Sequence, residues 1–163
     1  MIIAAIRNVA VTLAWLILLT GVAPAETTTP KEQVRAQIGR LLERYAANDA
    51  DEVVALMAPE FVLYGSDVAE ICRTPEQLRK LMADDFRLWG TATFNDIRDE
   101  DIRVFGKVAT ANFHVSFSAG GGKEVPVRFS MTLEKINNTW RIVQSANTVP
   151  TQGSSAAELT GSK

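Results

Sequence analysis

Apolar and polar residues alternate through the last part of the chain, and this alternation restricts the fold more than any other feature of the sequence. From Thr91 onward the period is two, which is typical of strands with one buried face. Turn residues divide this region into four predicted strands, at about 92–104, 107–118, 124–136 and 139–148. Consecutive hairpins of this kind form an antiparallel sheet whose apolar face must be covered.

The pairing of the second and third of these strands can also be predicted. Three glycines at 120–122 suit a hairpin loop, because glycine tolerates positive φ. This loop places Phe113 opposite Phe129, and His114 opposite Arg128 on the other face. A shift by one residue would mix apolar with polar pairs, which favours this register.

Asn137-Asn138 predicts the next hairpin, since Asn tolerates positive φ at both central positions of a two-residue turn. Leu133 then faces Ile142, and Met131 faces Gln144. Three adjacent strands would therefore present a continuous apolar stripe on one face and aligned polar side chains on the other.

The polar side chains form two predicted rows. In one interpretation these rows face water and have no functional role, while the apolar stripe packs against the helices. Alternatively the rows line a cavity or a dimer contact, where an imidazole beside a guanidinium and a carboxamide would recognise an anion or a carbonyl group. The first row holds His114, Arg128 and Asn147, and the second holds Asn112, Ser130 and Ser145.

Helices precede the sheet. Thr29 and Glu32 have the residue types of a capping box around Pro30, so a long helix is predicted to start there. Asn48-Asp49 ends this helix and caps a short second one, which Pro59 is predicted to stop.

A strand is predicted at 61–65, followed by an irregular segment and a third helix from Thr74 to Gly90. Helices first and a meander of strands last is the α+β arrangement, with helices packed on one side of a curved antiparallel sheet.

The first 25 residues have the organisation of a secretory signal peptide. Arg7 precedes an apolar run, and Ala23 and Ala25 give an A-x-A site. The run is shorter than the about 20 apolar residues of a spanning helix, so we expect cleavage and export to the periplasm or the medium rather than a retained anchor. The expected organisation is a signal peptide at 1–25, a flexible lead-in at 26–30, one domain at 31–149 and a disordered tail at 150–163.

Composition excludes several classes of function. The chain has 17 basic and 19 acidic residues and no basic run, so nucleic-acid binding has no electrostatic support. Its single cysteine, Cys72, forms no internal disulfide. One His and one Cys on different elements do not make a metal site, and we expect no cofactor.

The order of these segments resembles the SnoaL-like branch of the nuclear transport factor 2-like superfamily over about residues 31–149. The resemblance is carried by NDADEVVALM at 48–57, the helix-to-strand step at 59–64, RFS from Arg128 and WRIV from Trp140. It implies a cone, in which a curved sheet wraps a long N-terminal helix and encloses a pocket at its wide end. It also implies a homodimer through the sheet.

The resemblance implies little catalytic machinery. Steroid isomerase-like members carry a Tyr near the position of Leu41 and an Asp base at about Gly65, so both groups are absent here, and Tyr45 lies a helical turn later. The loop acids Asp67 and Glu70 are interpreted as solvated. SnoaL-type cyclases carry His where this chain continues as residues 144–146.

The association domain of calcium/calmodulin-dependent kinase, which places cations from successive strands in its pocket, is similar in another respect. His114 and Arg128 would be the counterparts here, with Asn147 in place of a further cation. Tyr64 and Trp89 would line the pocket mouth if they are not core residues.

Three hypotheses follow. The first is an exported binding protein for a small anionic or carbonyl-bearing ligand. The second is a cofactor-independent isomerase, cyclase or dehydratase with His114 as its only candidate acid or base. The third is a homo-oligomerisation module without a ligand. No contact with nucleic acid, or with membrane after signal cleavage, is expected.

Overall fold

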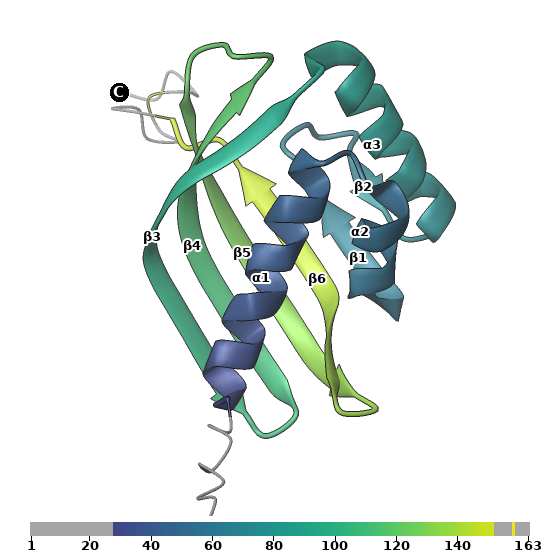
Figure 1. The fold of residues 1–163 in the computed structure, drawn as a ribbon, viewed down its shortest axis with the longest axis vertical. Helices are drawn as coiled ribbons and strands as arrows, with labels where there is room; N and C mark the ends of the chain where they lie inside the picture. The colour runs from purple at the N-terminus through teal and green to yellow at the C-terminus, as the bar shows by residue number, and fades with distance from the viewer. Residues whose placement is uncertain (1–27, 152–157, 159–163) are drawn as a thin grey trace, which may run out of the picture.

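A computed structural model describes residues 28–151 and residue 158. One face of a six-stranded curved sheet carries α1, and α2 and α3 lie over its β1–β2 side (Figure 1). The predicted signal peptide, residues 1–25, lies outside the described residues, as does most of the predicted tail. None of the described helices is long and apolar enough to cross a membrane. The elements are α1 Pro30–Ala46, α2 Ala50–Leu56, β1 Met57–Tyr64, β2 Ile71–Cys72, α3 Pro75–Trp89, β3 Ala92–Phe105, β4 Val108–Ala119, β5 Val125–Ile136 and β6 Thr139–Thr148.

Side-chain caps start each helix where the sequence predicts it. Thr29 and Glu32 form a reciprocal capping box at α1. The side chain of Asp49 accepts from the Glu52 N–H at α2, and that of Thr74 accepts from the Gln77 N–H at α3. At its other end α3 stops at Gly90, whose φ of 72° disfavours residues with a Cβ.

The boundary between α2 and β1 differs from the prediction. Pro59 does not stop the helix, because Met57 is already extended with φ −77° and ψ 153°. Pro59 instead lies inside β1, in the stretch where the ladder to β6 is irregular. Proline has no N–H, and at this place its absence removes no regular ladder hydrogen bond. The short strand β2, which pairs with Leu63 and Tyr64, falls in the segment predicted to be irregular.

The sheet has the strand order β2-β1-β6-β5-β4-β3. All neighbours are antiparallel except β1 and β6, which run parallel. The predicted register of β4 and β5 is confirmed, with Phe113 opposite Phe129 and His114 opposite Arg128. The apolar side of these strands packs with α1 into one core, in which the Phe113 and Phe129 rings stack at 5.1 Å between centroids.

The predicted register of β5 and β6 is correct only near the turn. Leu133 faces Ile142, but Met131 faces Ser145 rather than Gln144. The register shifts between Thr132 and Leu133, so Val143 is the extra residue of a β-bulge. Because side chains alternate with period two, one extra residue moves every later side chain of β6 to the other face.

Candidate functional site

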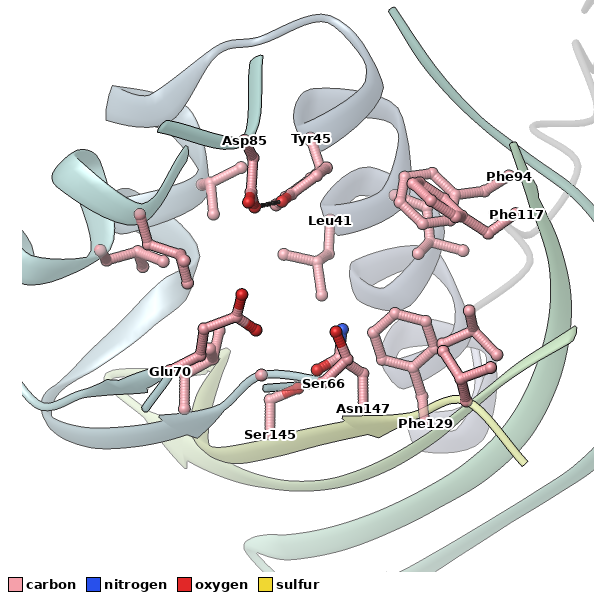
Figure 2. Close-up of a pocket in the computed structure, with 18 of the residues that line it drawn as sticks. Leu41, Tyr45, Ser66, Glu70, Asp85, Phe94, Phe117, Phe129, Ser145 and Asn147 are labelled. Atoms are coloured by element: carbon pink, nitrogen blue, oxygen red, sulfur yellow. Dashed lines mark hydrogen bonds between the residues drawn. The ribbon is translucent and has the colours of Figure 1, made fainter. Parts of the chain in front are cut away.

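A cavity of about 150 Å³ opens between the C-terminal half of α1, α3 and the face of the sheet that carries the helices (Figure 2). Apolar side chains form most of its wall, and six polar residues face it from different elements. The polar residues are Tyr45 on α1, Ser66 and Glu70 after β1, Asp85 on α3, and Ser145 and Asn147 on β6.

Aromatic rings form one side of the cavity; the Asp85 and Glu70 carboxyl groups lie away from them, and Asn147 lies next to Phe129 (Figure 2). Phe94 lies 5.4 Å from Phe117 and 6.5 Å from Phe129 between ring centroids. Trp89 lies edge-on to Phe117 at 5.2 Å. These contacts fix the rings relative to one another, so the aromatic side is preformed for a flat apolar body.

A hydrogen bond joins the first and third helices at the cavity. The Tyr45 hydroxyl donates a hydrogen bond to Oδ2 of Asp85, and Asp85 is only 7% exposed. Burial raises the pKa of Asp85, the bond from Tyr45 opposes that rise, and nearby Glu70 adds to it. Burial likewise raises the pKa of Tyr45, as does its bond to the Asp85 carboxylate. The pair therefore holds its proton on Tyr45, with Asp85 as acceptor.

Sequence reasoning did not single out Asp85, although its spacing carries a signal. Leu78, Met82 and Asp85 recur at helical spacing and are the buried residues of α3. An acid in line with two core positions is exceptional, because carboxylates are almost never buried without a partner. That partner is Tyr45, which was judged only by its offset from the isomerase position.

Replacing Asp85 with Asn should stabilise the protein at pH 8. The pKa of Asp85 is higher in the folded chain than in the unfolded chain. As the pH rises from the unfolded-chain pKa through the folded-chain pKa, ionisation of Asp85 therefore lowers the stability of the fold. Asn keeps the acceptor for Tyr45 without the charge. We expect a gain of about 0.5–2 kcal/mol in the free energy of unfolding at pH 8, vanishing near pH 3.

Urea unfolding at the two pH values measures this gain, and Asp84→Asn is the control of opposite sign. Asp84 bonds to Lys80 at 2.6 Å, which lowers its pKa, so its ionised form stabilises the fold and that benefit is lost as the pH falls. A less stable Asp85→Asn protein at pH 8 would contradict the account.

Glu70 reaches the cavity because residue 65 has no side chain. A Cβ built on Gly65 would lie 2.1 Å from Oε2 of Glu70. The carboxylate is held there by the Asp67 N–H at 3.1 Å, and the Gly65 N–H bonds to the Glu70 carbonyl at 2.8 Å. The space beside Gly65 is thus filled by a carboxylate from five residues downstream.

The bulge at Val143 brings two further polar side chains into the cavity. Ser145 is buried opposite Met131, and Asn147 lies opposite Phe129. Oδ1 of Asn147 is buried and has no hydrogen-bond partner within the described residues. A buried acceptor left unpaired is costly, so this atom is available to a ligand donor.

Of the other sequence-predicted site residues, Trp89 also lines the cavity and the rest lie away from it. Tyr64 is 40% exposed and outside the lining. His114 and Arg128 lie on the opposite face of the sheet, because Phe113 and Phe129 take the inner face. Asn112 and Ser130, paired with each other, share that outer face.

On the outer face His114 is bonded on both ring nitrogens. Its Nδ1 lies 3.0 Å from Oδ2 of Asp99, and Arg128 donates from Nε to its Nε2 at 3.0 Å. An acceptor Nε2 requires the proton on Nδ1, so this geometry is that of a neutral imidazole held between an acid and a guanidinium. Asn147, predicted to join this row, is absent from it because of the bulge.

No group of three or more His, Cys, Asp or Glu side chains in the described ranges could hold a metal ion. Cys72 is buried beside the cavity acids, and burial, followed by Glu70 and Asp85, raises the pKa of its thiol. That shift keeps the thiol protonated and unreactive.

The sequence pattern of the SnoaL-like domain matches residues 34–152. This chain belongs to the SnoaL-like domain family. No curated protein matches it. Solved structures of nuclear transport factor 2-like (NTF2-like) proteins share its fold, which confirms the predicted α+β cone.

Three similar structures illustrate the range of the fold. An NTF2-like protein of unknown function from Pseudomonas putida KT2440 is 14% identical, with a TM-score of 0.68, covering 78% of this chain and 91% of that one. An NTF2-like protein with a cystatin-like fold from Novosphingobium aromaticivorans is 19% identical, with a TM-score of 0.63 and coverage of 78% and 86%. An NTF2-like protein from Streptomyces avermitilis, whose name suggests a dehydratase, is 13% identical, with a TM-score of 0.65 and coverage of 74% and 96%.

Proposed function

We propose that this SnoaL-like protein binds a small ring-bearing organic molecule in the cavity between α1, α3 and the sheet. The observation that carries the proposal is a mostly apolar cavity with aromatic rings on one side and a few hydrogen-bonding groups, among them Asp85 and Glu70, on its other walls. Small-molecule sites in proteins have this composition, a mostly apolar wall with a few placed polar groups.

The size of the cavity sets the size of the ligand. Its volume of about 150 Å³ matches the size of apolar cavities that take up benzene. One aromatic or alicyclic ring therefore fits against Phe94, Phe117 and Phe129. A substituent on that ring would reach the polar side, where Asp85, Glu70 and Asn147 present oxygen acceptors.

The cavity offers no support for the predicted anionic ligand. Among the described residues that line it there is no Arg, Lys or His, and two carboxyl groups face it. The predicted cationic pair, His114 and Arg128, is on the other side of the sheet. The complementary substituent is one that donates hydrogen bonds, such as a hydroxyl or an amino group.

Proton-transfer chemistry, as in an isomerase or dehydratase, would fall to Glu70 and Asp85 rather than to His114. These carboxyl groups differ in environment, because Asp85 is buried and bonded to Tyr45 while Glu70 comes from an exposed turn. Export from the cell and pairing of two copies through the outer face of the sheet stay predictions.

Titration with benzyl alcohol, followed by amide chemical shifts, tests the binding proposal. Saturable shifts should be confined to the residues around the cavity. Leu41→Phe should weaken binding roughly tenfold or more, because the side chain of Leu41 points into the cavity and a larger one would fill it (Figure 2).

Leu88→Phe is the matched control, since Leu88 is 71% exposed on α3 and outside the cavity lining. It should bind benzyl alcohol as the parent chain does, with both variants checked for thermal stability. Shifts that do not saturate, or that spread over the outer face of the sheet, would overturn the proposal.

A further inference from the structure

We infer that the ligand of this cavity is an organic cation, an ammonium group carried on an apolar ring. The inference rests on the proposed function and narrows it to one ligand charge. Its basis is that two carboxyl groups face a mostly apolar cavity with no cationic partner among the described residues, together with an unpaired acceptor and aromatic rings at the same cavity.

Many surface acids already have a cationic partner. Asp84 pairs with Lys80 at 2.6 Å, and Asp51 with Arg79 at 2.8 Å. In the described part of the chain, Asp85 and Glu70 form no ion pair. Carboxylates beside an apolar wall without a counter-charge are costly, because little water solvates them. A bound cation would supply the missing charge.

The titration of neighbouring groups indicates negative potential in the cavity. Burial is the largest cause of the raised pKa values of Tyr45 and Cys72, and the charges of Glu70 and Asp85 add to both. Glu70 also adds to the raised pKa of Asp85 itself. The field that opposes these ionisations would favour a positive group at the same place.

The acceptors are arranged for a group with several donors. Asp85 lies on one side of the cavity, and Glu70 and Asn147 lie across from it (Figure 2). An ammonium group has up to three N–H donors and no acceptor, whereas a hydroxyl has one donor. An ammonium could therefore satisfy both carboxylates and the buried, unpartnered Oδ1 of Asn147.

The aromatic wall of the cavity favours the same ligand. Phe94, Phe117 and Phe129 present aromatic surface to the cavity, and aromatic faces attract cations that lie within about 6 Å of the ring centroid. The ring of the ligand would pack on the phenyl groups, and its charged substituent would lie between them and the carboxylates.

Gly65 makes this arrangement possible. Any side chain at residue 65 would displace the Glu70 carboxylate, whose Oε2 lies 2.1 Å from where a Cβ would be. The glycine thus determines that the acid at this edge of the cavity comes from Glu70, which is long enough to move with a ligand.

Three single-ring probes of similar size separate the possible ligand charges at pH 7: benzylamine as the cation, benzyl alcohol as the neutral form and benzoate as the anion. We expect benzylamine to bind at least about tenfold more tightly than benzyl alcohol in amide-shift titrations, and benzoate to bind most weakly. Glu70→Gln should remove most of that preference, since Gln keeps the bond from the Asp67 N–H but carries no charge. Glu60→Gln, on an exposed β1 position outside the lining, should retain the preference.

The outcomes distinguish this inference from the proposed function. If benzyl alcohol binds as tightly as benzylamine, or benzoate binds best, the cation assignment is wrong and the cavity remains a binding site. If none of the three probes shifts the residues around the cavity, the proposed function itself fails. The comparison of probes on the parent chain decides the matter even if the Glu70→Gln protein does not fold.

Discussion

Deleting Val143 should leave binding in the cavity intact and change the free energy of unfolding by no more than about 1–2 kcal/mol. The deletion removes the extra residue of the bulge, so the pairs on either side of it are kept and the ladder between β5 and β6 becomes regular. Ser145 and Asn147 would keep their places opposite Met131 and Phe129 and would stay in the cavity.

Urea unfolding and titration with benzyl alcohol measure stability and binding. Val143→Ala is the matched control, because it shortens the side chain but keeps the number of residues and therefore the bulge. It should retain binding and lose about 1 kcal/mol. A deletion protein that no longer binds would show that the bulge itself, and not only the pairing beyond it, shapes the cavity.

This bulge marks the limit of what the sequence could predict about the sheet. The β4–β5 register was predictable because apolar residues occupy every inner position, so a slip would expose all of them at once. In β6 the apolar alternation ends at Ile142, and beyond it small polar residues fit either face. No glycine marks the extra residue, and only the Ile142-Val143 pair breaks the alternation.

The cavity acids could not be recognised from local sequence for a different reason. Glu70 lies in a polar turn, and nothing near it in sequence indicates that its side chain passes over Gly65 into the cavity. From the sequence, Gly65 is interpreted as the absence of a base, whereas in the structure its lack of a side chain leaves room for the Glu70 carboxylate. Asp85 and Tyr45 are on separate helices, so their bond exists only after α1 and α3 pack.

His114 and Arg128 show the opposite case, in which the pairing was predictable and the face was not. Their register position is as predicted, and they contact each other. Alternation alone states that apolar and polar side chains point to opposite sides, and the helices cover the apolar side. A cavity on that side draws its polar groups from exceptions to the pattern, which are Ser145, Asn147 and the two acids.

Replacing Phe113 with Ala should lower the free energy of unfolding by about 3–5 kcal/mol. Phe113 is 1% exposed and stacks on Phe129, with 10° between the two ring planes. Its loss removes a large buried side chain and leaves a void that the rigid sheet cannot close. Phe129 also lines the cavity, so loss of its stacking partner should weaken ligand binding as well.

Phe105→Ala is the matched control, because Phe105 is 63% exposed at the end of β3 and should cost less than about 1 kcal/mol. Urea unfolding of the two variants gives the comparison. Equal effects would mean that Phe113 is not a core residue and that the apolar face of β4 and β5 is not the one against α1. A large loss at Phe113 alone would support the inner face as the side on which both the core and the cavity are built.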